Sequence, residues 1–191
     1  MKYAGFWQRL IAGLIDFFVL LIPSAAIALL SGSSKTLAFI CETPLGLLYW
    51  GYTFYFLSKR GQTIGKQAIC IRVVNIDGSK ITQTTAFRRC IVDLCIGIIS
   101  TIGALWGIAC ISPEEFVSLT WTTRNLAIQK FQPNFIRWVD IASTIWVCSE
   151  VLVVIFNVKK RALHDFIAGT VVIVDSVPGE PIAGMRKQHD S

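Results

Sequence analysis

Charged residues inside apolar segments are the feature of this sequence most able to do chemistry. The stretch from Trp7 to Pro23, WQRLIAGLIDFFVLLIP, carries Arg9 and Asp16. A charge at the centre of a bilayer costs about 2.5–3.5 kcal/mol on insertion scales, so it is usually paired, protonated or functional. A buried carboxylate with a raised pKa can alternate between a proton and a cation, and this exchange is the chemistry that the pattern suggests.

The spacing of Arg9 and Asp16 places both residues on one face of a helix. Seven residues at about 100° each bring the two side chains within about 20° around the axis and about 10 Å along it. Gly5, Ala12 and Gly13 share that face, and small residues let another helix approach closely. We therefore expect the face to pack inside a bundle, where the two charges form either a helix lock or an ion site.

Acids also lie in the other apolar segments: Glu42, Asp93, Asp140 and Glu150. Asp93 follows Arg89 by four residues, a spacing that suits a local ion pair near the membrane surface. Glu150 lies well inside its apolar segment, on a polar stripe at helical spacing. For Glu150, as for Asp16, a structural lock and an ion-binding role are equal alternatives.

The composition indicates which elements must position these charges. Of the 191 residues, 53% are hydrophobic and 16% charged, and the mean hydropathy is +0.58, as in integral membrane proteins. A spanning helix needs roughly 20 mostly apolar residues, and four segments qualify: about 5–30, 36–57, 90–111 and 135–157. We therefore predict an all-α membrane protein, a four-transmembrane-helix bundle, whose membrane domain covers residues 1–175.

The first apolar segment has one competing interpretation, a cleaved signal peptide. The small residues of PSAAIA, positions 23–28, resemble a cleavage site. Asp16 in the middle of the apolar region and the length of the segment argue against cleavage. We expect the segment to remain as a mature helix.

The remaining segments carry local signals of their own. In ICIRVVNIDGSKIT, residues 69–82, β-branched runs flank an Asp-Gly turn, which predicts a small cytoplasmic β-hairpin. The segment TVVIVD, residues 170–175, could add a third strand. In the outer loop 112–134, Ser112, Pro113 and Glu115 resemble a helix start with a capping box, so an amphipathic helix is expected there. The tail 176–191 is expected to be disordered.

The charge distribution predicts the orientation in the membrane. The net charge is +6, and with a cytoplasmic N-terminus 14 of the 18 Lys and Arg residues fall on the cytoplasmic side. We expect an integral protein of the bacterial plasma (inner) membrane with both termini in the cytoplasm. Topology and anionic lipid explain the basic surplus, so the lipid bilayer is the expected partner and no nucleic acid is. A homo-oligomer or a membrane protein partner is a further expectation.

We recognise no enzymatic motif in the sequence. The segment GQTIGK, residues 61–66, has three residues between its glycines and Gln67 after its lysine, whereas a phosphate loop needs four and then Ser or Thr. No motif places a Ser or Cys nucleophile. None of the six cysteines forms a CxxC pair that would suggest zinc or a disulfide framework. We expect no catalytic residue, no metal site and no cofactor, and therefore no enzyme.

Four stretches together resemble the RDD family of membrane proteins, which is named for one Arg and two Asp. They are AGFWQRLIAGLID, GQTIGKQAICIRVVNIDG, AFRRCIVDL and KKRALHDFIAGTVVIV, and they cover about residues 4–175 in the family's order. The resemblance assigns the Arg to Arg9, the first Asp to Asp16 and the second to Asp165, with Asp93 as the alternative. It implies a helical membrane bundle with cytoplasmic termini. The outer loop 112–134 matches no family pattern.

Two functions follow as hypotheses, because the family resemblance does not settle an activity. Some members are suggested to exchange sodium and protons, and others to assist larger membrane complexes. The first hypothesis is therefore Na⁺/H⁺-type transport by a homo-oligomer that uses buried acids. The alternative is a non-catalytic scaffold, assembly factor or subunit of a membrane complex. The residues that would bind the ion or lock the helices are Arg9, Asp16, Asp93, Glu150 and Asp165.

Overall fold

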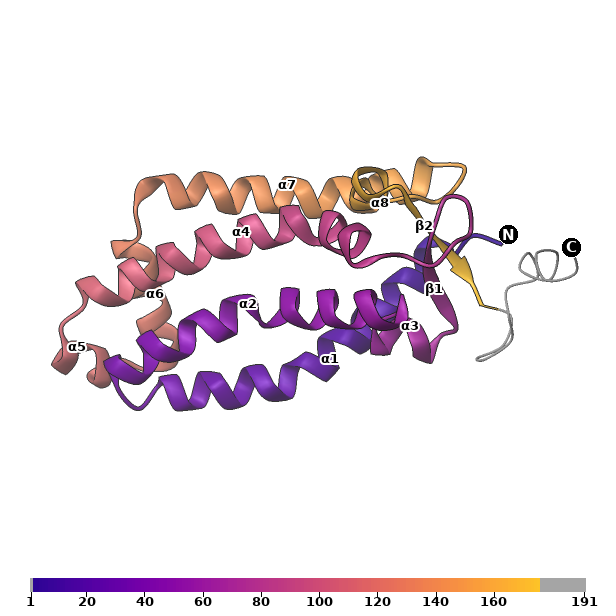
Figure 1. The fold of residues 1–191 in the computed structure, drawn as a ribbon. Helices are drawn as coiled ribbons and strands as arrows, with labels where there is room; N and C mark the ends of the chain where they lie inside the picture. Colours follow the sequence, from indigo (N-terminus) through magenta and orange to yellow (C-terminus); the bar gives the residue numbers. More distant parts are fainter. Residues whose placement is uncertain (1, 176–191) are drawn as a thin grey trace, which may run out of the picture. The chain divides into compact units, whose positions relative to one another are not determined.

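The computed structural model describes residues 2–175, and the tail that the sequence predicts to be disordered lies outside the described residues. By internal contacts the chain divides into two compact units, and the long helices contribute to both. Unit 1 contains residues 2–19, 53–90 and 148–175, and unit 2 contains residues 20–52 and 91–147. Figure 1 labels the elements, which are, in chain order, α1 (Phe6–Ser31), α2 (Lys35–Arg60), α3 (Ile64–Ala68), β1 (Ile71–Asn75), α4 (Gln83–Cys110), α5 (Pro113–Ser118), α6 (Trp121–Phe131), α7 (Asn134–Phe156), α8 (Leu163–Ala168) and β2 (Thr170–Val174).

Three of the long helices are long and apolar enough to cross a membrane. These are α1, α4 and α7, with 26, 28 and 23 residues. Many of their large apolar side chains are exposed, such as Ile22 at 77% and Phe156 at 82%, as expected for surfaces that lipid covers. The expected helix over 36–57 is present as α2, which has 26 residues. α2 is not among the helices that length and composition identify, so within residues 2–175 they give three spans where the sequence predicted four.

The small sheet differs from the predicted hairpin. β1 pairs antiparallel with β2, in a register that places Ile71 opposite Val174 and Asn75 opposite Thr170. The Asp-Gly turn is present, with Gly78 at a φ of 86°, but the run after it contributes only an isolated bridge between Val74 and Lys80. The hairpin prediction was therefore wrong in its partner strand, and the segment 170–175, expected as a third strand, supplies β2.

The loop 112–134, which the sequence predicts to lie outside, contains two short helices instead of one. Ser112 caps α5 as predicted, because its hydroxyl accepts a hydrogen bond from the backbone N–H of Glu115. The chain leaves helical geometry at Leu119, and Thr120 then caps α6 by accepting from the N–H of Thr123. Each cap satisfies a backbone donor that a helix start would leave unpaired.

Close packing in unit 2 depends on glycine in α4. A Cβ on Gly103 would come within 2.7 Å of Cγ1 of Ile136, and one on Gly107 within 2.9 Å of Cγ2 of Ile128. Both distances are too short for carbon atoms, so only glycine lets α4 approach α7 and α6 this closely. One cluster of buried residues in this unit contains Ala38, Ile108, Ile111 and Phe116.

Candidate functional site

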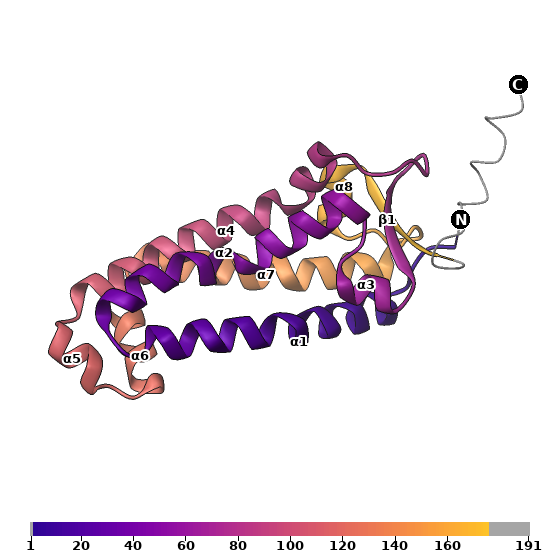
Figure 2. The same ribbon diagram turned by 60° about the horizontal axis from the view of Figure 1, so that its bottom comes forward.

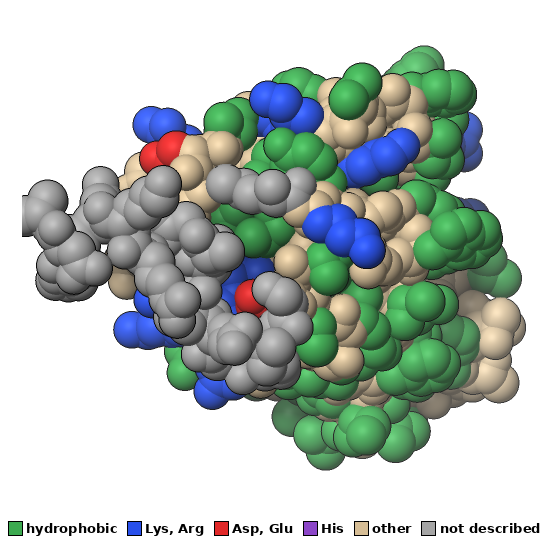
Figure 3. Space-filling view, turned by 90° about the vertical axis from the view of Figure 1, so that its right-hand side faces the viewer, with side chains coloured by type: hydrophobic (Ala, Val, Ile, Leu, Met, Phe, Trp, Pro, Cys, Tyr) green, Lys and Arg blue, Asp and Glu red, His purple; other side chains and the backbone are tan. Residues whose placement is uncertain are grey.

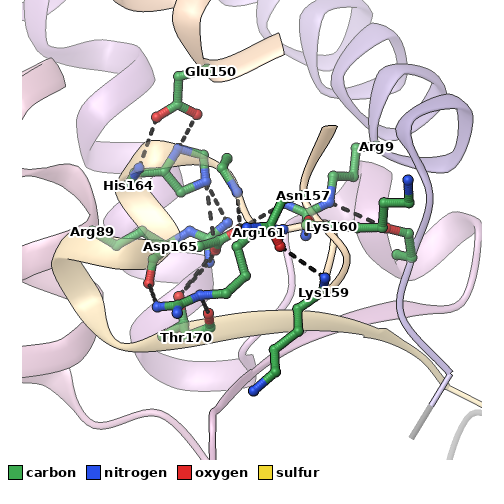
Figure 4. A network of polar contacts seen from close by, with 12 residues as sticks. Arg9, Arg89, Glu150, Asn157, Lys159, Lys160, Arg161, His164, Asp165 and Thr170 are labelled. Carbon is green, nitrogen blue, oxygen red and sulfur yellow. Dashed lines mark hydrogen bonds and ion pairs between the residues drawn. The ribbon is translucent and has the colours of Figure 1, made fainter. Parts of the chain in front are cut away.

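Asp165, on α8 in unit 1, is the centre of a polar network. Its side chain is 0% exposed. Oδ2 accepts from Nη1 of Arg9 at 2.7 Å and from the backbone N–H of Ala162 at 3.0 Å. Oδ1 forms an ion pair with Nη1 of Arg89 and accepts from the hydroxyl of Thr170 at 3.0 Å. Figure 4 shows α1, α4 and the segment that includes α8 and β2 meeting at this one carboxylate.

Arginine side chains in this network also hold the chain between α7 and α8. Arg9 donates from Nη2 to the carbonyl of Lys160 at 2.5 Å. Arg161 donates to the carbonyl of Asp165 at 2.8 Å and to that of Thr170 at 3.1 Å. Lys160 has a φ of 50°, an uncommon conformation for a residue with a side chain. Arg9 therefore satisfies a carbonyl at this bend, and Arg161 connects the bend to α8 and β2.

Glu150 and His164 extend the network along α7. Oε1 of Glu150 accepts from the backbone N–H of His164 at 2.9 Å, and Oε2 contacts Nδ1 of His164. Nε2 of His164 lies 2.6 Å from Nη2 of Arg89. A guanidinium only donates, so Nε2 must accept and Nδ1 must carry the proton that it shares with Glu150. The order of hydrogen bonds is therefore Glu150, His164, Arg89 and Asp165. We call these residues, with Arg9 and Thr170, the Asp165 cluster.

The charges around Asp165 set its ionisation. Burial raises the pKa of this carboxyl, but the neighbouring side chains, Arg89 foremost, and the hydrogen bond from the N–H of Ala162 together hold the pKa well below its usual range. Asp165 is thus a carboxylate at any physiological pH. A hollow of about 190 Å³ lies beside the cluster, lined by Arg9, Glu150 and His164 and by apolar side chains of α1 and α7.

Asp16 lies outside this cluster and holds α3 against α1. Its carboxylate accepts from the hydroxyl of Thr63 at 2.6 Å and from the backbone N–H of Gly65 at 2.7 Å. Gly65 is buried against the backbone of Ala12, one helical turn before Asp16. Figures 1 and 2 both show α3 beside the first half of α1. The segment GQTIGK, which the sequence excludes as a phosphate loop, thus supplies the partner of Asp16.

The sequence-predicted residues fall into three places. Arg9, Glu150 and Asp165 meet in the Asp165 cluster, whereas Asp16 lies at α3. Asp93 lies in unit 2, where it accepts from Nε1 of Trp146 at 3.0 Å. The ion pair of Arg89 is with Asp165, a partner that the four-residue spacing of Arg89 and Asp93 did not indicate.

Sequence reasoning missed three contributors to these contacts, namely Arg89 as a partner of Asp165, and Thr63 and Gly65 as partners of Asp16. The prediction that the small-residue face of α1 packs inside the protein was right only in part. Ala12 is buried at 1% exposure, whereas a Cβ on Gly13 would meet nothing within 4 Å. The signal for Thr63 and Gly65 was the segment GQTIGK, since Thr63 stands where the start of a helix needs a polar residue.

Lys66 on α3 gives a testable pH dependence. Its Nζ lies 3.4 Å from the Thr63 hydroxyl, and burial, with the field of Arg89, lowers its pKa to about 8. The unfolded chain keeps this proton up to the ordinary pKa of 10.5, so between these values the unfolded state binds more protons and stability rises with pH. We expect Lys66→Met to remove a rise on the order of 1 kcal/mol between pH 7.5 and 10, measured by thermal unfolding in detergent. Lys2→Met is the control, because Lys2 is exposed, and an unchanged rise in Lys66→Met would contradict the assignment.

Comparison with known proteins identifies the family. No solved structure matches the chain. The uncharacterised protein YckC of Bacillus subtilis strain 168 is 28% identical over 186 residues, an alignment that covers 94% of this chain and 89% of that protein. The model of the RDD family matches residues 3–169, which include Arg9, Asp16 and Asp165. The chain therefore belongs to the RDD family.

Proposed function

We propose that this RDD protein is a non-catalytic membrane module, a scaffold, assembly factor or subunit whose family residues lock a cytoplasmic structure onto a helix bundle. The observation that carries the proposal is that Asp16 and Asp165 both bind loop segments of their own chain. Asp16 holds α3, and Asp165 holds α1 and α4 to the segment before β2. Buried polar networks of this kind fix one arrangement of their elements.

The occupancy of Asp165 favours a structural role over ion binding. A carboxylate has about four lone-pair positions, and Asp165 uses them for Arg9, Ala162 N–H, Arg89 and the Thr170 hydroxyl. A cation that bound there would have to displace two guanidinium groups. That exchange would leave two positive charges buried beside the incoming cation, which is electrostatically unfavourable.

The proposed topology has four spans, with α2 as the fourth. Its 26 residues are long enough to cross, and its basic end, Lys59 and Arg60, would lie on the same side as both termini. In this topology the small sheet of unit 1 would lie on the cytoplasmic side, and the loop with α5 and α6 on the opposite side. Membership of a family with a bacterial relative supports the bacterial plasma membrane as the location.

Proton-coupled cation transport is the second candidate, and one observation favours it. Glu150 and His164 are hydrogen-bonded to each other beside a hollow, and their side chains are 16% and 22% exposed. Imidazole can accept and release protons near neutral pH. A path that used these two groups would not need to displace the arginines from Asp165.

Flux measurements distinguish the two candidates. We expect proteoliposomes under an imposed sodium or potassium gradient to show no proton flux above that of empty vesicles, for the wild type and for Glu150→Gln and Asp16→Asn. Asp16→Asn should instead lower the free energy of unfolding by about 1 kcal/mol, because its hydrogen bonds to Thr63 and Gly65 lose their charge.

Asp77→Asn is the matched control, since Asp77 is exposed and accepts from the N–H and the hydroxyl of its near neighbour Ser79. Wild-type flux that disappears in Glu150→Gln, with folding unchanged, would contradict the module.

The proposed module also requires a partner. We expect the chain in mildly solubilised native membranes to migrate in a larger assembly than the purified protein, and equal sizes would count against it.

A further inference from the structure

A hollow of about 400 Å³ opens in unit 1 where α2 ends. Gly61 adopts the left-handed conformation, with φ of 68°, and so ends the helix and turns the chain back. Its carbonyl accepts a hydrogen bond from the N–H of Val73 at 2.9 Å, which brings β1 to the same place. We call this feature the basic hollow, and its lining includes Lys59, Arg60, Gln62, Gln67, Arg72 and Lys80.

Positive charge in the basic hollow exceeds the negative charge near it. Arg72 has a partner, because its Nη2 lies 2.8 Å from the carboxylate of Asp175. Within residues 2–175, the structure gives no acidic partner to Lys59, Arg60 or Lys80, and all three are exposed. These three charges repel one another, and an anion between them would relieve the repulsion.

The donors around the hollow suit a phosphate group. Lysine binds phosphate as a point charge, and the arginine guanidinium matches the spacing of two phosphate oxygens. Gln67 adds an exposed carboxamide that can donate to a third oxygen. A volume of about 400 Å³ lies within the range of small-molecule sites and admits a group the size of a phosphoglycerol.

The position of the hollow along α2 indicates a lipid as the source of the phosphate. Tyr49 and Tyr55 are exposed on α2 one to three turns before its end, and exposed tyrosines lie at the level of lipid headgroups. Arg60 lies over the ring of Phe56, 5.7 Å from its centre. Figure 3 looks onto the side of the protein on which β1 lies in Figure 1, and Lys and Arg side chains are visible on this surface.

We propose that the basic hollow binds the phosphate of an anionic phospholipid headgroup in the leaflet where α2 ends. Basic pockets at the cytoplasmic ends of helices are suited to such headgroups. The inference goes beyond the proposed function. The hollow and the Asp165 cluster have no residue in common. A negative result for lipid binding therefore leaves the proposed membrane module standing, and a negative result for the module leaves the lipid site standing.

The test compares two triple variants that remove the same charge. In the first, Lys59, Arg60 and Lys80 become Gln. In the control, the exposed residues Lys2, Arg88 and Lys159 become Gln. Binding of phosphatidylglycerol to purified protein in neutral detergent is measured by native mass spectrometry, with phosphatidylcholine as the uncharged reference. We expect the first variant to bind phosphatidylglycerol at least about tenfold more weakly than the wild type, and the control to bind it within about twofold.

Competition with inorganic phosphate and glycerol 1-phosphate tests whether the hollow binds the phosphate of a lipid headgroup or that of a soluble phosphate ester. Phosphatidylglycerol binding that resists millimolar amounts of either supports the lipid headgroup. Displacement by micromolar amounts would assign the hollow to a soluble phosphate ester and overturn the lipid source. Equal losses in the two triple variants, or equal binding of phosphatidylcholine by the wild type, would overturn the site itself. Thermal unfolding of all three proteins verifies that they are folded.

Discussion

Replacing Asp165 by asparagine is expected to lower the free energy of unfolding by about 3–5 kcal/mol. The substitution leaves the guanidinium groups of Arg9 and Arg89 without their counter-charge, and these side chains are only 13% and 6% exposed. Breaking a buried ion pair costs more than the pair itself contributes, because an uncompensated charge stays behind. For a chain of this length, the melting temperature in detergent should fall by roughly 10 °C.

Two comparisons test the physical reason for this loss. Asp77→Asn is the control, because Asp77 is exposed on a turn, and we expect its melting temperature to stay near that of the wild type. In double-mutant cycles, Arg9 and Asp165 should show a coupling energy of about 1–3 kcal/mol, whereas Arg9 and Asp16 should show almost none. Strong coupling between Arg9 and Asp16 would mean that the pair suggested by sequence spacing is the real one.

The pH dependence of the Asp165 contribution follows from its low pKa. A carboxylate whose folded-state pKa lies below its unfolded value stabilises the protein above the unfolded value of about 4, and its contribution is lost only as pH falls through the folded-state value. The difference in stability between the wild type and Asp165→Asn should therefore be constant from pH 5 to 8. A difference that disappeared at pH 5 would indicate a carboxyl that releases its proton near neutrality.

Helical periodicity indicated part of the packed face of α1, with Ala12 and Asp16, but not the polar partners of its charges. The seven-residue spacing of Arg9 and Asp16 correctly put both on one side of α1. It could not show that Arg9 would contact Asp165, which lies 156 residues further along the chain. Ion pairs at such separations depend on tertiary packing, and the local pattern contains no information about it. For the same reason the Asp-Gly turn suggested a local hairpin, while β1 pairs with a strand that begins at Thr170.

The structure also explains how α1 tolerates Asp16. This residue lies about 15 Å along the helix from Phe6, at 1.5 Å per residue. The segment with Thr63 and Gly65 covers that face of α1 and supplies the two hydrogen bonds to its carboxylate. Asp16 is 6% exposed, so on this face the helix meets protein, which satisfies the charge as lipid cannot. The sequence predicted that the face was packed, but it suggested another membrane helix as the neighbour, where the structure has the short helix α3.

The close contact between α1 and α3 makes Gly65→Ala the second substitution with a large expected effect. A Cβ at this position would overlap the backbone carbonyl oxygen of Ala12 and come within 2.9 Å of Cγ of Asp16. A helix backbone cannot move aside as a flexible side chain can, so α3 must shift away and the hydrogen bonds of Asp16 must lengthen. We expect a loss of about 3 kcal/mol, the upper end of overpacking costs, measured by thermal unfolding in detergent.

Gly13→Ala, one residue after Ala12, is the matched control for this prediction. A Cβ on Gly13 would meet nothing within 4 Å, so alanine there should be neutral or slightly stabilising, because it lowers the entropy that the helix loses on folding. Asp16→Asn combined with Gly65→Ala should cost less than the two separate losses together, since both act on the same contact between α1 and α3. Additive losses, or a tolerated Gly65→Ala, would mean that α3 does not rest on Asp16. The proposed lock of the cytoplasmic structure would then depend on the Asp165 cluster alone.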